Sequence, residues 1–158
     1  MSSELDVTIP PRMNISDCCL DENIRASRGE KVGLIADGHP YTYRQVTEMA
    51  ARVGSALCKL GMQAEQRALL VLSDSAEFVA SFFGVTRLGA VPVPVNTMLA
   101  PADYAHFLED SRARVLIVDS DLLPQVPLDS PWLEYVVVVG GHAGHRHSSP
   151  DGGPKFLA

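Results

Sequence analysis

Apolar residues between positions 67 and 98 form two short runs separated by a helical pattern. The first run, 67–72, predicts a buried strand, and the polar residues Ser73, Asp74 and Ser75 then provide oxygens that can cap a helix start. The next segment is apolar over a wide arc and ends at Gly89. A second apolar run follows at 90–95. Because a helix between two strands nearly always joins them in parallel with a right-handed crossover, this stretch predicts one βαβ unit.

Helical spacing also occurs on both sides of this unit. Between 43 and 60 the apolar residues recur three and four apart, with Thr42 as a capping residue before them and Gly61 as a stop after them. A second helical pattern covers 101–110, and a shorter one covers 15–27. We therefore expect one helix before the βαβ unit, one after it and a short helix near the N-terminus.

Short apolar runs bounded by turn residues predict the remaining strands. They lie at 32–36, 41–43, 115–118 and 134–139. Asp37-Gly38 between the first two is a strong hairpin signal. The later alternation of helix and apolar strand is typical of α/β proteins, and we predict a mostly parallel, doubly wound sheet with helices on both faces, preceded by a small β-hairpin. Pro92 and Pro94 lack N–H groups on the same side of their strand, so this strand belongs at an edge or is irregular.

The pattern divides the chain into three parts. Residues 1–13 are polar and contain two prolines, which indicates an extended arm. Residues 14–139 hold all the periodic segments and form an α/β subdomain, complete or part of a larger fold. Residues 140–158 have no period and predict a flexible tail.

Composition narrows the function classes. The chain has 13 lysines and arginines against 19 aspartates and glutamates, and this net charge of −6 argues against a nucleic-acid surface. Its three cysteines have no zinc or disulfide spacing, which favours reduced thiols. The N-terminus lacks a signal-peptide pattern, and no apolar run approaches the roughly 20 residues of a membrane span. We expect a cytoplasmic protein without membrane contact.

Candidate chemistry is sparse. The loop 73–75 could face an anion, but it has no glycine and Asp74 repels negative charge, so we interpret it as a helix cap. The glycine-rich segment 140–144 follows a strand and could cradle phosphate, yet it lacks the dinucleotide spacing and fits a linker better. No carboxylate or cysteine is spaced to complete a metal site with the tail histidines, so we predict no metal site. These histidines are His142, His145 and His147.

Four segments in fixed order resemble the opening part of the AMP-forming acyl-CoA synthetase family, the adenylate-forming enzymes. Three carry the family resemblance: PYTYRQVTEMAARVGSALCKLGM, SAEFVASFFGVTRLGAVPVPVNTML and DYAHFLEDSRARVLIV. The fourth, MNISDCCLDENIRASRGEKVGLIADG, is most similar to the benzoate-CoA ligase and aryl-CoA ligase subgroup. The resemblance covers residues 14–139 and implies an incomplete N-terminal subdomain of a larger fold.

The resemblance implies a two-step reaction in which a carboxylate attacks ATP to form an acyl-adenylate and CoA thiol then displaces AMP. The whole enzyme of this family uses ATP, Mg²⁺ and CoA. Its phosphate loop, nucleotide-binding aspartate and catalytic lysine lie downstream of the matched region, so we expect no catalytic residue and no cofactor in this fragment. Gly152-Gly153-Pro154-Lys155 resembles the end of the phosphate loop, but Asp151 stands where phosphate belongs, and we interpret the match as coincidence.

The resemblance places one loop, Asn96, Thr97 and Met98, at the CoA approach. Some relatives have a basic residue near the position of Met98, whose apolar side chain cannot make that charge contact. The implied partners are the rest of the ligase, its later N-terminal subdomains and its C-terminal domain, and a second copy of the chain. The wide apolar helix 75–88 needs cover on both sides, so we expect a truncated chain to leave an apolar patch there, and we predict self-association or poor solubility.

Two alternatives stay open. The chain could be a stand-alone, non-catalytic α/β binding or interaction module derived from the same family. It could also be a flavodoxin-like domain that holds a flavin, since the pattern of elements alone does not distinguish these folds.

Overall fold

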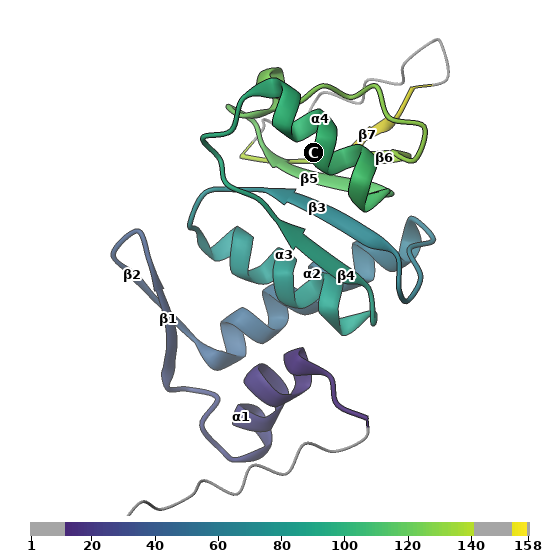
Figure 1. Cartoon of the computed structure of the whole chain (residues 1–158). Helices are drawn as coiled ribbons and strands as arrows, with labels where there is room; N and C mark the ends of the chain where they lie inside the picture. Colours follow the sequence, from purple (N-terminus) through teal and green to yellow (C-terminus); the bar gives the residue numbers. More distant parts are fainter. Residues whose placement is uncertain (1–11, 141–152, 158) are drawn as a thin grey trace, which may run out of the picture.

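A five-stranded parallel sheet forms the centre of the computed structural model, which describes residues 12–140 and 153–157 (Figure 1). The strand order is β4-β3-β5-β6-β7, and each neighbouring pair is parallel. The strands are β3 (Arg67–Val71), β4 (Val91–Pro94), β5 (Val115–Asp119), β6 (Tyr135–Val139) and β7 (Lys155–Leu157). The predicted α/β class is therefore confirmed, while all but two residues of the predicted arm lie outside the described residues.

The helices begin and end where the sequence predicts. Thr42 and Gln45 form a reciprocal capping box at the start of one helix, and the Ser75 side chain accepts a hydrogen bond from the Phe78 N–H at the start of the next. Gly61 and Gly89 follow these two helices with φ of 77° and 70°. The helices are η1 (Asp17–Asp21, a π-helix), α1 (Glu22–Arg25), α2 (Tyr43–Lys59), α3 (Ala76–Arg87), α4 (Pro101–Ser111) and η2 (Leu123–Gln125, a 3₁₀-helix). Within the described ranges, none is both long and apolar enough to cross a bilayer.

The predicted hairpin precedes the sheet. Its strands are β1 (Val32–Ala36) and β2 (His39–Thr42), which pair antiparallel. Asp37 and Gly38 have φ of 49° and 75°, the positive values that a tight two-residue hairpin turn needs at both central positions. The hairpin prediction is confirmed.

Two separate hydrophobic clusters lie on the two faces of the sheet. On one face α4 and the connection 120–134 pack against β3, β5 and β6, with Tyr104 and Leu108 fully buried. On the other face α2 and α3 pack against the sheet through residues such as Leu57 and Val85. The predicted arrangement of helices on both faces is confirmed, and it follows from right-handed crossovers that step in opposite directions from β3.

Close contact between α2 and α3 depends on two glycines. A Cβ atom added to Gly84 would lie 2.8 Å from the Val53 Cβ and 2.9 Å from the Ala50 carbonyl oxygen. One added to Gly54 would lie 3.1 Å from the Gly84 carbonyl oxygen. The two helices therefore cross with backbone almost against backbone, which leaves no room for side chains there.

The edge position of β4 is confirmed by its hydrogen bonds. The N–H of Val91 donates to the Gln66 carbonyl, and the N–H of Val95 donates to the Leu70 carbonyl. Pro92 and Pro94 alternate with these donors, so the missing N–H groups face away from β3. In the strand order β4 lies at one end.

One prediction for the C-terminal region is wrong in part. Residues 155–157 were predicted as part of the flexible tail 140–158, but they form β7, which pairs with β6. The Lys155 N–H donates to the Glu134 carbonyl, and Phe156 packs against the α4-side cluster. This strand has only three residues, so its pairing partner and not its own pattern specifies it. Residues 141–152, which include the tail histidines, lie outside the described residues.

Candidate functional site

The carboxyl ends of β3, β4 and β5 meet at the place where parallel sheets usually hold ligands. After β3 the chain forms β4 on one side of β3 and then β5 on the other side of β3. The strand order therefore reverses between β3 and β5, and this is the topological switch point. Beside it, the loops after β3 and β4 enclose a crevice of about 340 Å³. It is lined by Leu72, Ser73, Asp74, Phe78, Pro94, Val95, Asn96 and Thr97.

The loop after β3 is already engaged in internal hydrogen bonds. The Ser73 N–H donates to Asp119 Oδ2 at 2.7 Å, which ties the end of β3 to the end of β5 across the switch point. Ser75 Oγ accepts from the Phe78 N–H at 3.1 Å. The interpretation of this loop as a helix cap is therefore confirmed. Asp119 was not singled out from the sequence, although an acidic residue directly after an apolar strand was the available signal.

Two residues of the predicted CoA-approach loop line the crevice, and the third lies on the surface. Asn96 and Thr97 line the crevice, whereas the side chain of Met98 is 86% exposed and lies outside it. Asn96 Oδ1 accepts from the Met98 N–H at 2.8 Å, and Tyr104 Oη donates to the Asn96 carbonyl at 3.1 Å. These bonds fix the loop against α4. A role for the three residues in CoA binding stays a prediction.

Positive charge gathers at the opposite end of the strands. Arg67 begins β3 and donates through Nε to the Ser111 carbonyl, while Arg114 precedes β5 and donates to the Gly61 carbonyl. The guanidinium of Arg112 stacks over the Trp132 ring at 5.2 Å. Arg67 and Arg114 thus satisfy carbonyls at the C-terminal ends of α4 and α2, and we assign them a structural role.

Shifted pKa values occur in the N-terminal segments. Hydrogen bonds from Arg25 lower the pKa of Asp17, and the same contacts raise the pKa of Arg25. A hydrogen bond to Glu30 raises the pKa of Arg44 beside the hairpin. These are exposed ion pairs, which contribute little to stability.

The crevice does not fit a triphosphate. The Ser73 and Phe78 N–H groups are used internally, and the carboxylates of Asp74 and Asp119 add negative charge. Among residues 12–140 and 153–157 no three His, Cys, Asp or Glu side chains gather in a way that could hold a metal ion. These features oppose phosphate binding at the crevice, and the absence of a nucleotide contact in this chain stays a prediction.

Comparison with known proteins places the chain among adenylate-forming enzymes. Residues 20–148 match the family described as AMP-binding enzyme. The chain is 40% identical over 139 residues to a benzoate–CoA ligase of Thauera aromatica, an alignment that covers 85% of this chain and 26% of the relative. It is 38% identical over 124 residues to a 4-hydroxybenzoate–CoA/benzoate–CoA ligase of Rhodopseudomonas palustris, which covers 77% of this chain and 23% of that relative.

Solved structures agree with this match. An anthranilate CoA ligase crystallised with anthranoyl-AMP aligns with a TM-score of 0.78 at 41% identity, covering 85% of this chain and 26% of that structure. A benzoate CoA ligase of Burkholderia xenovorans aligns with a TM-score of 0.74 at 35% identity, covering 81% and 26% respectively. The chain thus spans about a quarter of the length of these relatives. The family match favours an adenylate-forming origin over the flavin alternative, and the chain belongs to the AMP-binding enzyme family.

Proposed function

We propose that this chain is the N-terminal part of an ATP-dependent, AMP-forming aryl-CoA ligase that activates an aromatic carboxylic acid of the benzoate type. The observation that carries the proposal is the 40% identity over 139 residues to a benzoate–CoA ligase. In the whole enzyme a carboxylate oxygen attacks ATP and releases pyrophosphate. The CoA thiol then attacks the acyl carbonyl, and AMP leaves.

The contribution of this chain is structural. Its sheet supplies one wall of the active-site cleft, and the loop of Asn96 and Thr97 borders the approach of CoA. The crevice at the switch point has internal hydrogen bonds where a phosphate would need donors, so the groups that bind ATP and Mg²⁺ come from the rest of the enzyme. The fragment alone is therefore inactive, and the enzyme acts in the cytoplasm.

The second candidate is a stand-alone, non-catalytic module derived from the family. The observation that favours it is the internal hydrogen bonding at the crevice. Asp119 and Ser75 accept hydrogen bonds from the N–H groups that a ligand would need. A module of this kind would act through its surface and would not depend on the remaining three quarters of the ligase.

A chimera distinguishes the two functions. In the Thauera aromatica benzoate–CoA ligase, this chain replaces the segment that aligns with it, and formation of benzoyl-CoA and AMP is measured. The parent enzyme, the parent without that segment and this chain alone are the controls. The proposal predicts thioester formation by the chimera and none by this chain alone.

A folded chimera that forms no thioester, beside an active parent, would favour the stand-alone module. Exchange of labelled pyrophosphate into ATP by this chain alone with benzoate would show that the fragment itself holds a nucleotide, against the assignment of its crevice.

A further inference from the structure

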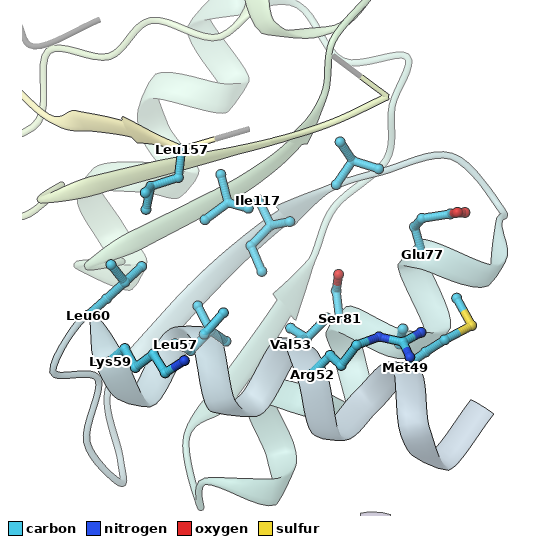
Figure 2. A pocket seen from close by; sticks show the side chains of 14 residues that line it. Met49, Arg52, Val53, Leu57, Lys59, Leu60, Glu77, Ser81, Ile117 and Leu157 are labelled. Atoms are coloured by element: carbon cyan, nitrogen blue, oxygen red, sulfur yellow. The ribbon is translucent and has the colours of Figure 1, made fainter. Parts of the chain in front are cut away.

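An apolar groove of about 510 Å³ lies between α2, the first turns of α3 and the outer strands of the sheet. Val53, Leu57 and Leu60 of α2 form one wall, and Ile117, Val137 and Leu157 of β5, β6 and β7 form the other. In Figure 2 the α2 side chains lie below Ile117 and Leu157, with Glu77 and Met49 at one end and Leu60 at the other. The groove is separate from the crevice at the carboxyl ends of the strands.

The handedness of the fold explains why this part of the sheet stays open. A right-handed step from β3 to β4 places α3 on one face, so every right-handed step in the other direction belongs on the opposite face. The connections into β5 and β6, α4 and residues 120–134, accordingly pack on that opposite face. Among the described residues, α2 and the first turns of α3 border β5 and β6 from this side, and the groove remains between them and the outer strands. Parallel sheets are normally covered on both faces, so the outer strands need further cover.

The chemistry of the groove favours a helix over a small molecule. A ligand pocket of this size normally contains a few converging polar groups. Here Ser81 is the single uncharged polar side chain among the described lining residues, and the charged side chains stand at the ends and rim. Two of them, Arg52 and Lys59, are exposed on α2 and make no ion pair within the described part of the chain. An amphipathic helix with an apolar face and flanking acidic residues matches both features.

We propose that this groove is the docking surface for an amphipathic, acid-flanked helix of the remaining ligase polypeptide. The inference rests on the proposed function. This chain spans about a quarter of the length of its relatives. The other three quarters of the ligase polypeptide can therefore supply a helix that packs on this face of the sheet. The helix contacts Val137 and Leu157 with its apolar face and places carboxylates beside Arg52 and Lys59.

Two alanines of α2 provide a matched test. Both Ala56 and Ala51 are exposed, but Ala56 lines the groove and Ala51 does not. The exposed native cysteines Cys18, Cys19 and Cys58 are changed to serine, and Ala56→Cys or Ala51→Cys is then introduced. Maleimide labelling rates are measured in this chain alone and in the chimera with the Thauera aromatica ligase.

In the isolated chain both introduced thiols should label quickly. In the chimera, labelling of Ala56→Cys should slow by about tenfold or more, because an interface core excludes water as a protein interior does, while Ala51→Cys should label as before. If the chimera does not fold, the same labelling is done after mixing this chain with the separately expressed remainder of the ligase.

Other outcomes overturn the inference. Unchanged labelling of Ala56→Cys in the chimera would show that the groove is not a docking surface, even if benzoyl-CoA forms and the proposed function stands. Slow labelling of the isolated chain would identify a second copy if dilution restores the rate, or a segment of the chain itself if it does not. Protection at Ala56→Cys in a chimera that forms no thioester would support docking and contradict the proposed function.

Discussion

The two faces of the sheet carry the same kinds of residue but differ in how completely other elements cover them. On the α4 face, Leu108, Leu116 and Val136 are 1%, 0% and 0% exposed, covered by α4 and residues 120–134. On the α2 and α3 face, Ile117 is equally buried, but Val137 and Leu157 remain partly exposed beside the groove. Hydrophobic patterning alone therefore does not determine which face closes. The direction and hand of the connections determine it.

Replacing one leucine on each face with alanine should give the largest difference in the free energy of unfolding between the two faces. Leu108→Ala in α4 should lower the free energy of unfolding by about 3 kcal/mol, because it leaves a cavity in a fully buried site. Leu60→Ala at the end of α2 should cost about 1 kcal/mol or less, because this partly buried side chain lines an open groove. Urea unfolding of both variants measures the difference. Equal losses would mean that the groove is closed in solution.

The α2–α3 layer is sensitive to added volume. Gly84→Ala should lower the free energy of unfolding by between about 2 and 3 kcal/mol, because its Cβ would meet Val53 and the Ala50 backbone at less than 3 Å. Gly54→Ala serves as the comparison and should cost less, since its nearest neighbour lies at 3.1 Å. Thermal unfolding followed by circular dichroism tests the order. A neutral Gly84→Ala would contradict the close helix crossing.

Two adjacent valines of β6 compare the two faces with the same residue type on the same strand. Val136 faces the α4 side and is fully buried, whereas Val137 faces the groove and is partly exposed. Val136→Ala should cost about 1.5 kcal/mol and Val137→Ala about 0.5 kcal/mol, in proportion to the apolar area each removes from the interior. The urea midpoints of the two variants measure this. A larger loss at Val137 would reverse the assignment of the two faces.

The smallest expected effect is an ion pair that lies on neither face. Arg25 lowers the pKa of Asp17 from its ordinary value of 3.8, so the folded state gains stability from this group above that value. The gain is lost as the pH falls through the lowered pKa. Asp17→Asn should therefore be slightly less stable than the wild type at about pH 7, and the difference should shrink at about pH 3. A difference that grows on acidification would contradict the lowered pKa.

Most of the layered scaffold could be predicted from local patterns. Thr42 and Ser75 marked two helix starts, and Pro92 with Pro94 placed β4 at an edge, because these residues act through their own backbone and immediate neighbours. The strand at 155–157 was missed because its conformation depends on pairing with β6, and no local pattern reports a partner so distant along the chain.

The functional surfaces were less accessible to prediction. Asn96 and Thr97 were located through family resemblance, and their place in the crevice could be described only once β3 and β4 were side by side. The apolar surface was expected around the helix at 75–88, yet Phe82 and Phe83 of that helix pack into two different clusters. The open groove borders the start of this helix, where Glu77, Ala80 and Ser81 line it, and extends between α2 and the outer strands, which the composition of the helix did not indicate.

Blocking the groove in the chimera tests the central claim most directly. The claim is that this chain functions as part of a ligase whose remaining polypeptide docks in the groove, and one measurement of thioester formation tests both parts. Ala56→Trp and Ala51→Trp place the same bulky side chain on α2, inside and outside the groove respectively. We predict that the chimera and its Ala51→Trp variant form benzoyl-CoA, and that Ala56→Trp lowers the rate by about tenfold or more because the docked helix no longer fits. Equal rates for the two variants, or a folded chimera without thioester formation, would contradict the claim.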